Sequence, residues 1–405
     1  MSAEHARDHL CPYAAVKRCF PARRGGCWIR GCYSARIYPA HPLLGKIKNR
    51  YLYLSNSTME PFIVIPCLNE EDYIAETCAS LGFKDGQEPF GRLVLVDNGS
   101  SDGTAKVMLA IQRTSPPGHV LIIQEHRRGY VAARRAGMAG VMAVAQQDQM
   151  LEEEVLVLQA DADTIYLPGY VQTMVNAHYC ARGQLLEGSS VTSREFNLEF
   201  PAFTQLCREV DNDMEHWFAP EERQVIVDDK ICAFLLTSYR AWGEHRDELD
   251  DSGEAVLAET TRLFMRAKSR GKVLREKVEN AQALPSRRRL RTQAPGYFAC
   301  SGFPRQMQWM AGWGRPDEAE RFLRSPHSLP TLNRLVRSRQ RHQLALFGLL
   351  PAVYDDEADV SPGLATLAKM IRGMLGTMSP GRLLGFMLKL ADEEDGPLAE
   401  LLRKR

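Results

Sequence analysis

The chain has 405 residues, with 51 Lys and Arg against 50 Asp and Glu, which gives a formal net charge of +1. This balance argues against a dedicated nucleic-acid-binding protein, whose surface would be strongly basic. The best apolar run, residues 344–354, is too short for a membrane-spanning helix and contains Pro351. We therefore expect a globular protein without a transmembrane segment, long enough to bury a substantial core.

Residues 1–58 differ in composition from the rest of the chain. They are rich in Lys and Arg, contain only two acids, and show neither a clear period nor the apolar segment of a secretory signal. We expect a disordered leader, or sequence upstream of the true start, before a folded domain that begins near Met59. Four of the ten cysteines lie here without a C-x-x-C pair, so a metal site is the weaker reading. The others are single and scattered, which is typical of a reduced cytosolic protein.

From Pro61 onward, short apolar runs alternate with amphipathic stretches. The patterns predict strands over 62–66, 92–97, 119–124 and 154–161, and helices over 70–83, 101–113, 129–146 and 168–183. Apolar strands alternating with helices predict an α/β fold with a parallel sheet covered on both faces. Beyond residue 190 a strand over 228–238 and a helix over 257–272 are predicted. From residue 305 the spacing is mostly helical, which predicts a packed appendage or, alternatively, a surface that docks on a membrane or partner.

Polar residues follow three of the predicted strands. The first strand leads into "NEE" at 69–71, the second into "DNGSSDGT" at 97–104, and the fourth into "DAD" at 161–163. Taken singly, each is explained equally well by turn formation, helix capping or a solvated loop. Ligands of such sheets bind outside the carboxyl ends of the strands, so the three together predict a site. Asp161 and Asp163 have no basic residue nearby in sequence, and a buried charge is costly without a partner.

Four segments in this order and spacing resemble the nucleotide-sugar half of family 2 glycosyltransferases: "VIPCLNEEDYI", "VDNGSSDGT", "GYVAARRAGM" and "ADADTIYLPGY". The resemblance covers residues 61–190 and extends more weakly toward residue 300. It implies the GT-A fold, a Rossmann-like, mostly parallel sheet flanked by helices. It also implies a nucleotide-sugar-binding half over 59–190, an acceptor and catalytic half over 191–304, and a helical C-terminal region over 305–405.

The resemblance further implies a metal-dependent, inverting transfer of a sugar from a nucleotide-diphosphate donor, with a UDP-sugar favoured, to an unknown hydroxyl acceptor. The missing partner of the two acids would be Mg²⁺ or Mn²⁺, which neutralises the departing diphosphate. Asp163 would ligate the metal, and Asp161 would share it or lie nearer the ribose. The residues implied to bind the nucleotide are Pro66, Asn69, Glu70, Asp97, Arg134 and Asp161. Glu70 as a helix cap and Arg134 as a surface cation remain alternatives.

The catalytic base of this family lies in a Glu-Asp pair at the start of a helix that ends in glycine. Here the frame "ETTRLFMRAKSRG" places Glu259 first and Thr260 second, and threonine cannot act as that base. Glu259, Asp251 and Glu254 are therefore the candidate bases, although Glu259 would also suit a helix N-terminus. A second departure is Asn98, where an acid is common.

The segment "LPSRRRLR" at 284–291 supplies Arg287 and Arg288, which the resemblance places near the diphosphate. A solvated basic loop explains them equally well. The segment has no histidine to serve as the third metal ligand of some relatives. We expect a cytoplasmic enzyme, with peripheral association with a membrane left open. A hydrolase of nucleotide-diphosphate sugars and a non-catalytic sugar-nucleotide-binding protein are the alternatives.

Overall fold

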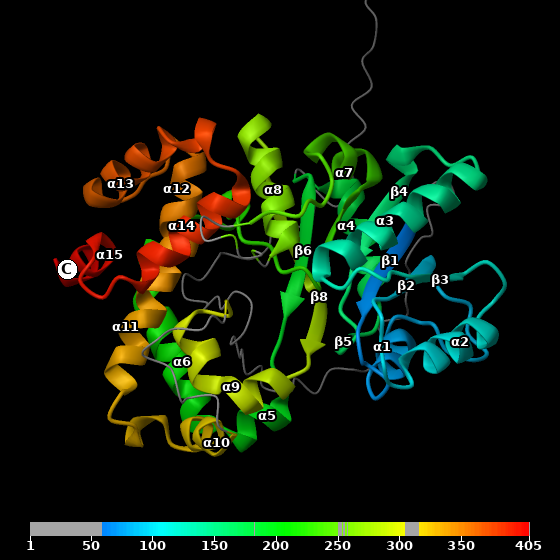
Figure 1. Ribbon diagram of the computed structural model, residues 1–405, viewed down its shortest axis with the longest axis horizontal. Helices are drawn as coiled ribbons and strands as arrows, with labels where there is room; N and C mark the ends of the chain where they lie inside the picture. Colours follow the sequence, from blue (N-terminus) through cyan, green and yellow to red (C-terminus); the bar gives the residue numbers. More distant parts are fainter. Residues whose placement is uncertain are drawn as a thin grey trace, which may run out of the picture.

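The structure is a computed structural model that describes residues 59–181, 183–249, 253, 256, 258–303 and 316–404. Its central element is an eight-stranded sheet with the order β3-β2-β1-β4-β7-β6-β8-β5 (Figure 1). The strands are β1 (Glu60–Cys67), β2 (Arg92–Asp97), β3 (Val120–Gln124), β4 (Val155–Gln159), β5 (Thr164–Tyr166), β6 (Leu185–Ser190), β7 (Cys232–Leu235) and β8 (Arg275–Pro285). The first four are mutually parallel, and β7 is antiparallel to β4 and β6. β8 is parallel to β6 and antiparallel to β5, so the sheet is mixed.

Helices cover both faces of this sheet. In β1, Ile63 and Ile65 share a core with α1 (Ile74–Ser80), α2 (Thr104–Thr114) and α4 (Tyr170–Cys180). Phe62 and Val64 share another core with α3 (Tyr130–Gln147), α7 (Leu236–Trp242) and α8 (Glu259–Arg270). Successive side chains of a strand point to opposite faces, so a strand buried on both sides needs apolar residues at every position. This is the reason for the uninterrupted run "FIVI".

Small residues bring α3 close to the sheet. A Cβ atom at Gly137 would stand 2.4 Å from Val64 Cγ1, and one at Gly140 would stand 2.3 Å from Ile123 Cδ1. Both distances are far shorter than a van der Waals contact, so only glycine allows this approach. The close packing fixes the position of Arg134, which lies one turn earlier on the same helix.

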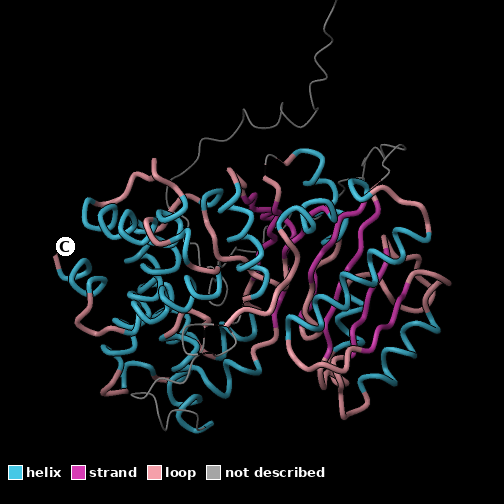
Figure 2. Tube along the Cα trace, turned by 45° about the horizontal axis from the view of Figure 1, so that its top comes forward, coloured by secondary structure: helices cyan, strands magenta, loops and turns pink. Residues whose placement is uncertain are grey.

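An all-helical half lies beside the sheet half (Figure 2). Its helices are α5 (Arg194–Glu199), α6 (Pro201–Met214), α9 (Arg288–Ala299), α10 (Pro316–Arg324), α11 (Leu332–Gln343), α12 (Leu350–Tyr354), α13 (Pro362–Arg372), α14 (Pro380–Asp392) and α15 (Pro397–Arg403). The rings of Phe203, Phe298 and Phe322 meet edge-to-face between α6, α9 and α10. A π-helical segment, Leu344–Leu349, joins α11 to α12. Within the described ranges, none of the helices combines the length and apolar character needed to cross a bilayer.

The predicted α/β class with a helical C-terminal region is confirmed, and the eight elements predicted before residue 190 are present with ends shifted by a few residues. The strand predicted over 228–238 is wrong at its end, because α7 begins at Leu236. Leu236, Tyr239 and Trp242 are the buried residues of that helix, and their spacing of three favours a helix. The predicted leader, with its four cysteines, lies outside the described residues. The described cysteines form no disulfide.

Candidate active site

Hydrogen bonds tie together the loops that follow β1 and β2. Asn69 adopts a left-handed conformation at φ 57°, and its side-chain oxygen accepts the Ser101 N–H at 2.8 Å. The Glu70 N–H donates to Thr104 Oγ1 at 2.7 Å. Asp97, the last residue of β2, lies beside this junction. The polar segments that the sequence placed after two separate strands therefore form one continuous surface.

Pro66 and Asp97 lie at the carboxyl ends of these neighbouring strands. Pro66 pairs with Val96 in the parallel register, and Asp97 follows directly. The Asp97 carboxylate accepts the Ser100 N–H at Oδ1 with a distance of 2.9 Å, and the residue is 8% exposed. Among the described residues Oδ2 has no hydrogen-bond partner, so it remains able to accept a bond from a ligand.

Asn98 takes a structural role that an acid could not fill. Its amide group donates to the carbonyls of Arg127 at 2.8 Å and Glu125 at 3.2 Å, and its oxygen accepts the Gly129 N–H at 2.9 Å. A carboxylate only accepts hydrogen bonds, so aspartate here would face two carbonyl oxygens without a donor. The asparagine thus anchors the loop that leads into α3.

Arg134 on α3 joins two of the predicted site acids. Its Nη2 lies 2.9 Å from Asp161 Oδ1, its Nη1 donates to the Ala160 carbonyl at 3.2 Å, and its Nε lies 3.4 Å from Glu259 Oε1. The side chains of Arg134 and Glu259 are 3% and 5% exposed, whereas that of Asp161 is 40% exposed. Asp161 therefore opens outward while Glu259 lies beneath it, and a role of Arg134 toward a nucleotide stays a prediction.

Asp163 and Glu70 share a second arginine. The Nη2 of Arg288, at the start of α9, lies 3.1 Å from Asp163 Oδ2 and also bonds Glu70 Oε1. Its guanidinium stacks over the Tyr73 ring at 4.8 Å from the centroid. Burial raises the pKa of Asp163, Asp161 adds to this effect, and Arg288 opposes it. Glu70 Oε2 is buried without a hydrogen-bond partner.

Three of the predicted site residues, Arg287, Asp251 and Glu254, are not found among the contacts described above. Arg287 bonds Thr192 Oγ1 at 2.8 Å and the Val191 carbonyl at 3.4 Å, on the side of β8 where β6 ends. Of the two arginines predicted near the diphosphate, Arg288 contacts the site acids Asp163 and Glu70. Asp251 and Glu254 lie outside the described residues.

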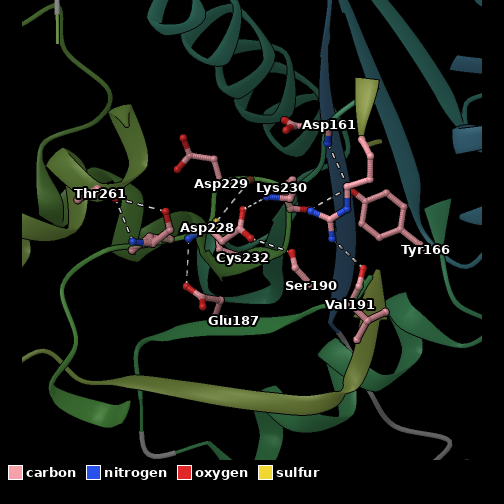
Figure 3. A network of polar contacts seen from close by, with 12 residues as sticks. Asp161, Tyr166, Glu187, Ser190, Val191, Asp228, Asp229, Lys230, Cys232 and Thr261 are labelled. Atoms are coloured by element: carbon pink, nitrogen blue, oxygen red, sulfur yellow. Dashed lines mark hydrogen bonds and ion pairs between the residues drawn. The ribbon is translucent and has the colours of Figure 1, made fainter. Parts of the chain in front are cut away.

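The turn at 228–230, which precedes β7, is a part of the site that sequence reasoning missed (Figure 3). The Tyr166 hydroxyl donates to the Lys230 carbonyl at 2.8 Å and accepts the Asp161 N–H at 3.1 Å. Asp228 accepts a hydrogen bond from Ser190 Oγ at 2.8 Å and another from the Lys230 ammonium. The signal was two adjacent acids in an otherwise apolar predicted strand, where a charge is rarely placed without a role.

Asp229 in this turn differs from its neighbours. Its carboxylate has no hydrogen-bond partner in the described part of the chain, and its Oδ1 atom is buried. Figure 3 shows the carboxylate pointing away from the hydrogen-bonded network of Asp228 and Lys230. Burial raises the pKa of Asp229, and so does Glu259, while Arg134 opposes them.

Thr260, the residue that replaces the expected acid, faces the core. Its Oγ1 donates to Gln159 Oε1 at 2.7 Å and lies 3.4 Å from His245 Nε2, and all three residues are buried. Burial lowers the pKa of His245, and Arg134 lowers it further, so this cluster is neutral. Gln159 was visible in the sequence as a polar residue at the end of an apolar strand, whereas nothing marked His245.

The acids of the site suit a hard divalent cation. Asp161, Asp163 and Glu70 offer only oxygen atoms, which Mg²⁺ and Mn²⁺ prefer, and Glu70 Oε2 is buried without a hydrogen-bond partner although Oε1 pairs with Arg288. Within the described residues there is no group of three or more His, Cys, Asp or Glu side chains placed to hold a metal. The protein would thus supply one or two ligands, with phosphate oxygens and water completing the set, as is usual for Mg²⁺.

Comparisons with known proteins match one part of the chain to a family. The family model described as "Glycosyl transferase family 2" matches residues 62–181. No relative was found among curated proteins.

Several solved structures are similar at low identity. A mannosyltransferase from Pyrobaculum calidifontis, in complex with GDP-Man and Mn²⁺, is 17% identical over 85% of this chain and 88% of its own, with a TM-score of 0.41. TarS 1–349 from S. aureus is 13% identical over 83% and 91%, with a TM-score of 0.40. Glucosyl-3-phosphoglycerate synthase from Mycobacterium tuberculosis, in complex with Mn²⁺, UDP and glucosyl-3-phosphoglycerate, is 16% identical over 64% and 81%, with a TM-score of 0.35. Likenesses at this level assign no ligand to this chain.

The matched residues 62–181 contain most of β1, all of β2 to β5, and the loops that carry Asn69, Asp97, Asp161 and Asp163. The family match thus covers the same strand ends at which the structure gathers the polar residues. The predicted family resemblance is confirmed over these residues, and the predicted mostly parallel sheet flanked by helices is present. Residues 62–181 of the chain therefore form a domain that matches glycosyl transferase family 2, as the resemblance in the sequence implied.

Proposed function

We propose that this protein is a glycosyltransferase that transfers a sugar from a nucleotide-diphosphate donor to a hydroxyl acceptor, with inversion at the anomeric carbon and with Mg²⁺ or Mn²⁺ bound. The observation that carries the proposal is the convergence of the loops after β1, β2 and β4. Asn69, after β1, accepts the N–H of Ser101, after β2, at 2.8 Å. Arg288 bonds both Glu70, after β1, and Asp163, after β4. The loops after three strands therefore meet at one edge of the sheet.

The nucleoside would lie over the ends of β1 and β2. Oδ2 of Asp97 is able to accept the imide N–H of a uracil base, and this is the reason for favouring a UDP-sugar. Pro66 and Asn69 would form the wall of the same pocket. The hydrogen bonds that fix Asn69 and Asp97 hold these groups in place before the donor arrives, which reduces the ordering cost of binding.

The diphosphate would lie between Asp161, which is bound to Arg134, and Asp163, which is bound to Arg288. Asp163 and Asp161 would hold the cation, with Glu70 beside them, and the bound cation would act as a Lewis acid on the departing diphosphate. Arg288 now pairs with Asp163 and Glu70. Once these carboxylates have a cation to balance them, its guanidinium is able to turn toward phosphate oxygens, for which its planar fork is well suited.

A thermal-shift screen of UDP- and GDP-linked sugars, each with and without Mn²⁺, tests the proposal. A ligand at 100 times its Kd stabilises the folded protein by about 2.7 kcal/mol, which is readily measured. We expect a UDP-sugar to raise the midpoint only when Mn²⁺ is present, and Asp163→Asn to abolish this rise. Asp356→Asn, an exposed acid in a turn after α12, is the matched control and should behave as wild type.

Two outcomes would contradict the proposal. If no nucleotide sugar shifts the midpoint under either condition, the chain has no donor site of this kind. If a donor binds but neither transfer nor release of the nucleoside diphosphate is detected over a panel of hydroxyl acceptors and water, the chain is a sugar-nucleotide-binding protein instead. Release to water alone would indicate a hydrolase.

A further inference from the structure

We propose that Asp229 takes the proton from the attacking hydroxyl, and that Glu259 instead holds Arg134 in place beside Asp161. This inference rests on the proposed function and names the base of that same reaction. It concerns a residue outside the helix-opening pair from which the base was predicted. Thr260 is buried against Gln159 and His245, so the second position of that pair supplies no acid.

Strand pairing places Asp229 at the level of the loop that carries Asp161 and Asp163. In the antiparallel register of β4 and β7, Leu158 pairs with Ala233. Extending this register brings Lys230 opposite Asp161, with Asp229 one residue further along. The Tyr166 hydroxyl confirms the juxtaposition, because it bonds both the Asp161 N–H and the Lys230 carbonyl. A carboxylate on this turn therefore lies next to the place where the sugar–phosphate bond would break.

The two candidate carboxylates, Glu259 and Asp229, differ in the hydrogen bonds that they already make. Glu259 is 5% exposed and bonded to Arg134, so an acceptor hydroxyl would have to displace a buried ion pair to reach it. Asp229 is partly exposed and its carboxylate makes no hydrogen bond with any described residue. A general base must come within hydrogen-bond reach of the proton that it removes, and its oxygen must be free to accept it. Of the two, only Asp229 meets the second condition.

No charged residue in the described part of the chain forms an ion pair with Asp229. Arg134, Glu259, Asp161 and Asp228 all act on it electrostatically. Arg134 is tied to Asp161 and Glu259 and does not bond Asp229. In this proposal Glu259 is a positioning residue, because it bonds the Arg134 guanidinium that also bonds Asp161.

The step balances without any further reactant. The acceptor oxygen forms a bond to the anomeric carbon from the side opposite the diphosphate. The bond between that carbon and the diphosphate oxygen breaks, and its electron pair leaves with the nucleoside diphosphate. The hydroxyl proton passes to an oxygen of Asp229 and afterwards to water.

Azide separates a base from a merely structural residue, because this anion attacks carbon without a proton to remove. The assay measures UDP release from UDP-glucose with Mn²⁺, using glycerol, water or azide as the acceptor. Asp229→Asn should lower release with glycerol and water by at least about 100-fold, the usual effect of losing a general base. It should leave azide-dependent release and the UDP-induced thermal shift unchanged. Glu259→Gln should lower release with all three acceptors by the same factor, and Asp356→Asn should change none of them.

The results that would overturn the inference are distinct from those that bear on the donor site. Equal losses with glycerol and azide in Asp229→Asn would show that Asp229 is not the base. A selective loss of the hydroxyl reaction in Glu259→Gln would assign the proton to Glu259. A wild-type protein that binds UDP with Mn²⁺ but releases none with any acceptor would also refute the role of Asp229. Absence of UDP binding would instead overturn the proposed function.

Discussion

Arg134→Met should be among the most destabilising single changes in the sheet half of the molecule. The guanidinium is buried and makes three bonds: to the Asp161 carboxylate at 2.9 Å, to the Ala160 carbonyl at 3.2 Å, and to the Glu259 carboxylate at 3.4 Å. Methionine fills much of the volume but leaves Glu259, 5% exposed, without its partner. Removing one member of a buried ion pair costs about 3–5 kcal/mol, since the remaining charge stays desolvated.

Urea denaturation measures this loss directly. Arg135→Met, the next residue of the same helix, is the matched control, because the Arg135 side chain is 50% exposed and its nearest approach to Asp247 is 4.0 Å. An exposed pair of this kind contributes at most about 1 kcal/mol. Adding Glu259→Gln to Arg134→Met should restore part of the lost stability, because the unpaired charge is removed. Equal effects of the two arginine substitutions would refute the idea that Arg134 is held as a buried bridge.

Three further changes have defined outcomes. Burial would raise the pKa of Glu187, but Arg275 and Lys277 outweigh this effect and lower the pKa from 4.5 to about 2. Wild type should therefore lose its stability advantage over Glu187→Gln as the pH falls from about 4.5 to about 2, which thermal midpoints measure. Gly137→Ala places a Cβ atom 2.4 Å from Val64 Cγ1 and should cost about 1–3 kcal/mol by urea denaturation, whereas Gly296→Ala on α9 meets open space and should cost nothing. Thr260→Asp restores the family's acid but buries it against Gln159, so it should lower stability by about 1–3 kcal/mol without raising the transfer rate. A stable, faster Thr260→Asp enzyme would contradict the buried arrangement.

The donor half was predictable because its signals are local. The strands are uninterrupted apolar runs, and their ends carry polar motifs that a parallel sheet must bring to one edge. That rule predicts that Asn69, Asp97, Asp161 and Asp163 lie at one edge of the sheet, whereas their roles are implied by the family resemblance. The end of β7 was missed because "CAFLLTS" continues as an apolar run across a change from strand to helix, and periodicity cannot mark a boundary inside such a run.

The rest of the site depends on contacts between segments far apart in sequence. The turn that carries Asp229 comes close to Asp161 because β7 returns antiparallel beside β4, and no local pattern predicts that pairing. Arg288 reaches Asp163 through the path of β8 and α9, whereas its neighbour Arg287 points to Val191. Two adjacent arginines are indistinguishable in sequence when the local backbone is unknown. His245 carries no signal at all, since its role follows from burial against Thr260.

The central claim is that acids at neighbouring strand ends hold a cation together with a diphosphate. Isothermal titration of UDP into the protein, with and without Mn²⁺, tests it most directly when wild type is compared with Asp163→Asn. We predict that Mn²⁺ strengthens UDP binding by wild type and that this gain disappears in Asp163→Asn, because the metal loses a carboxylate ligand. Binding of UDP with the same affinity in all four titrations would contradict the claim.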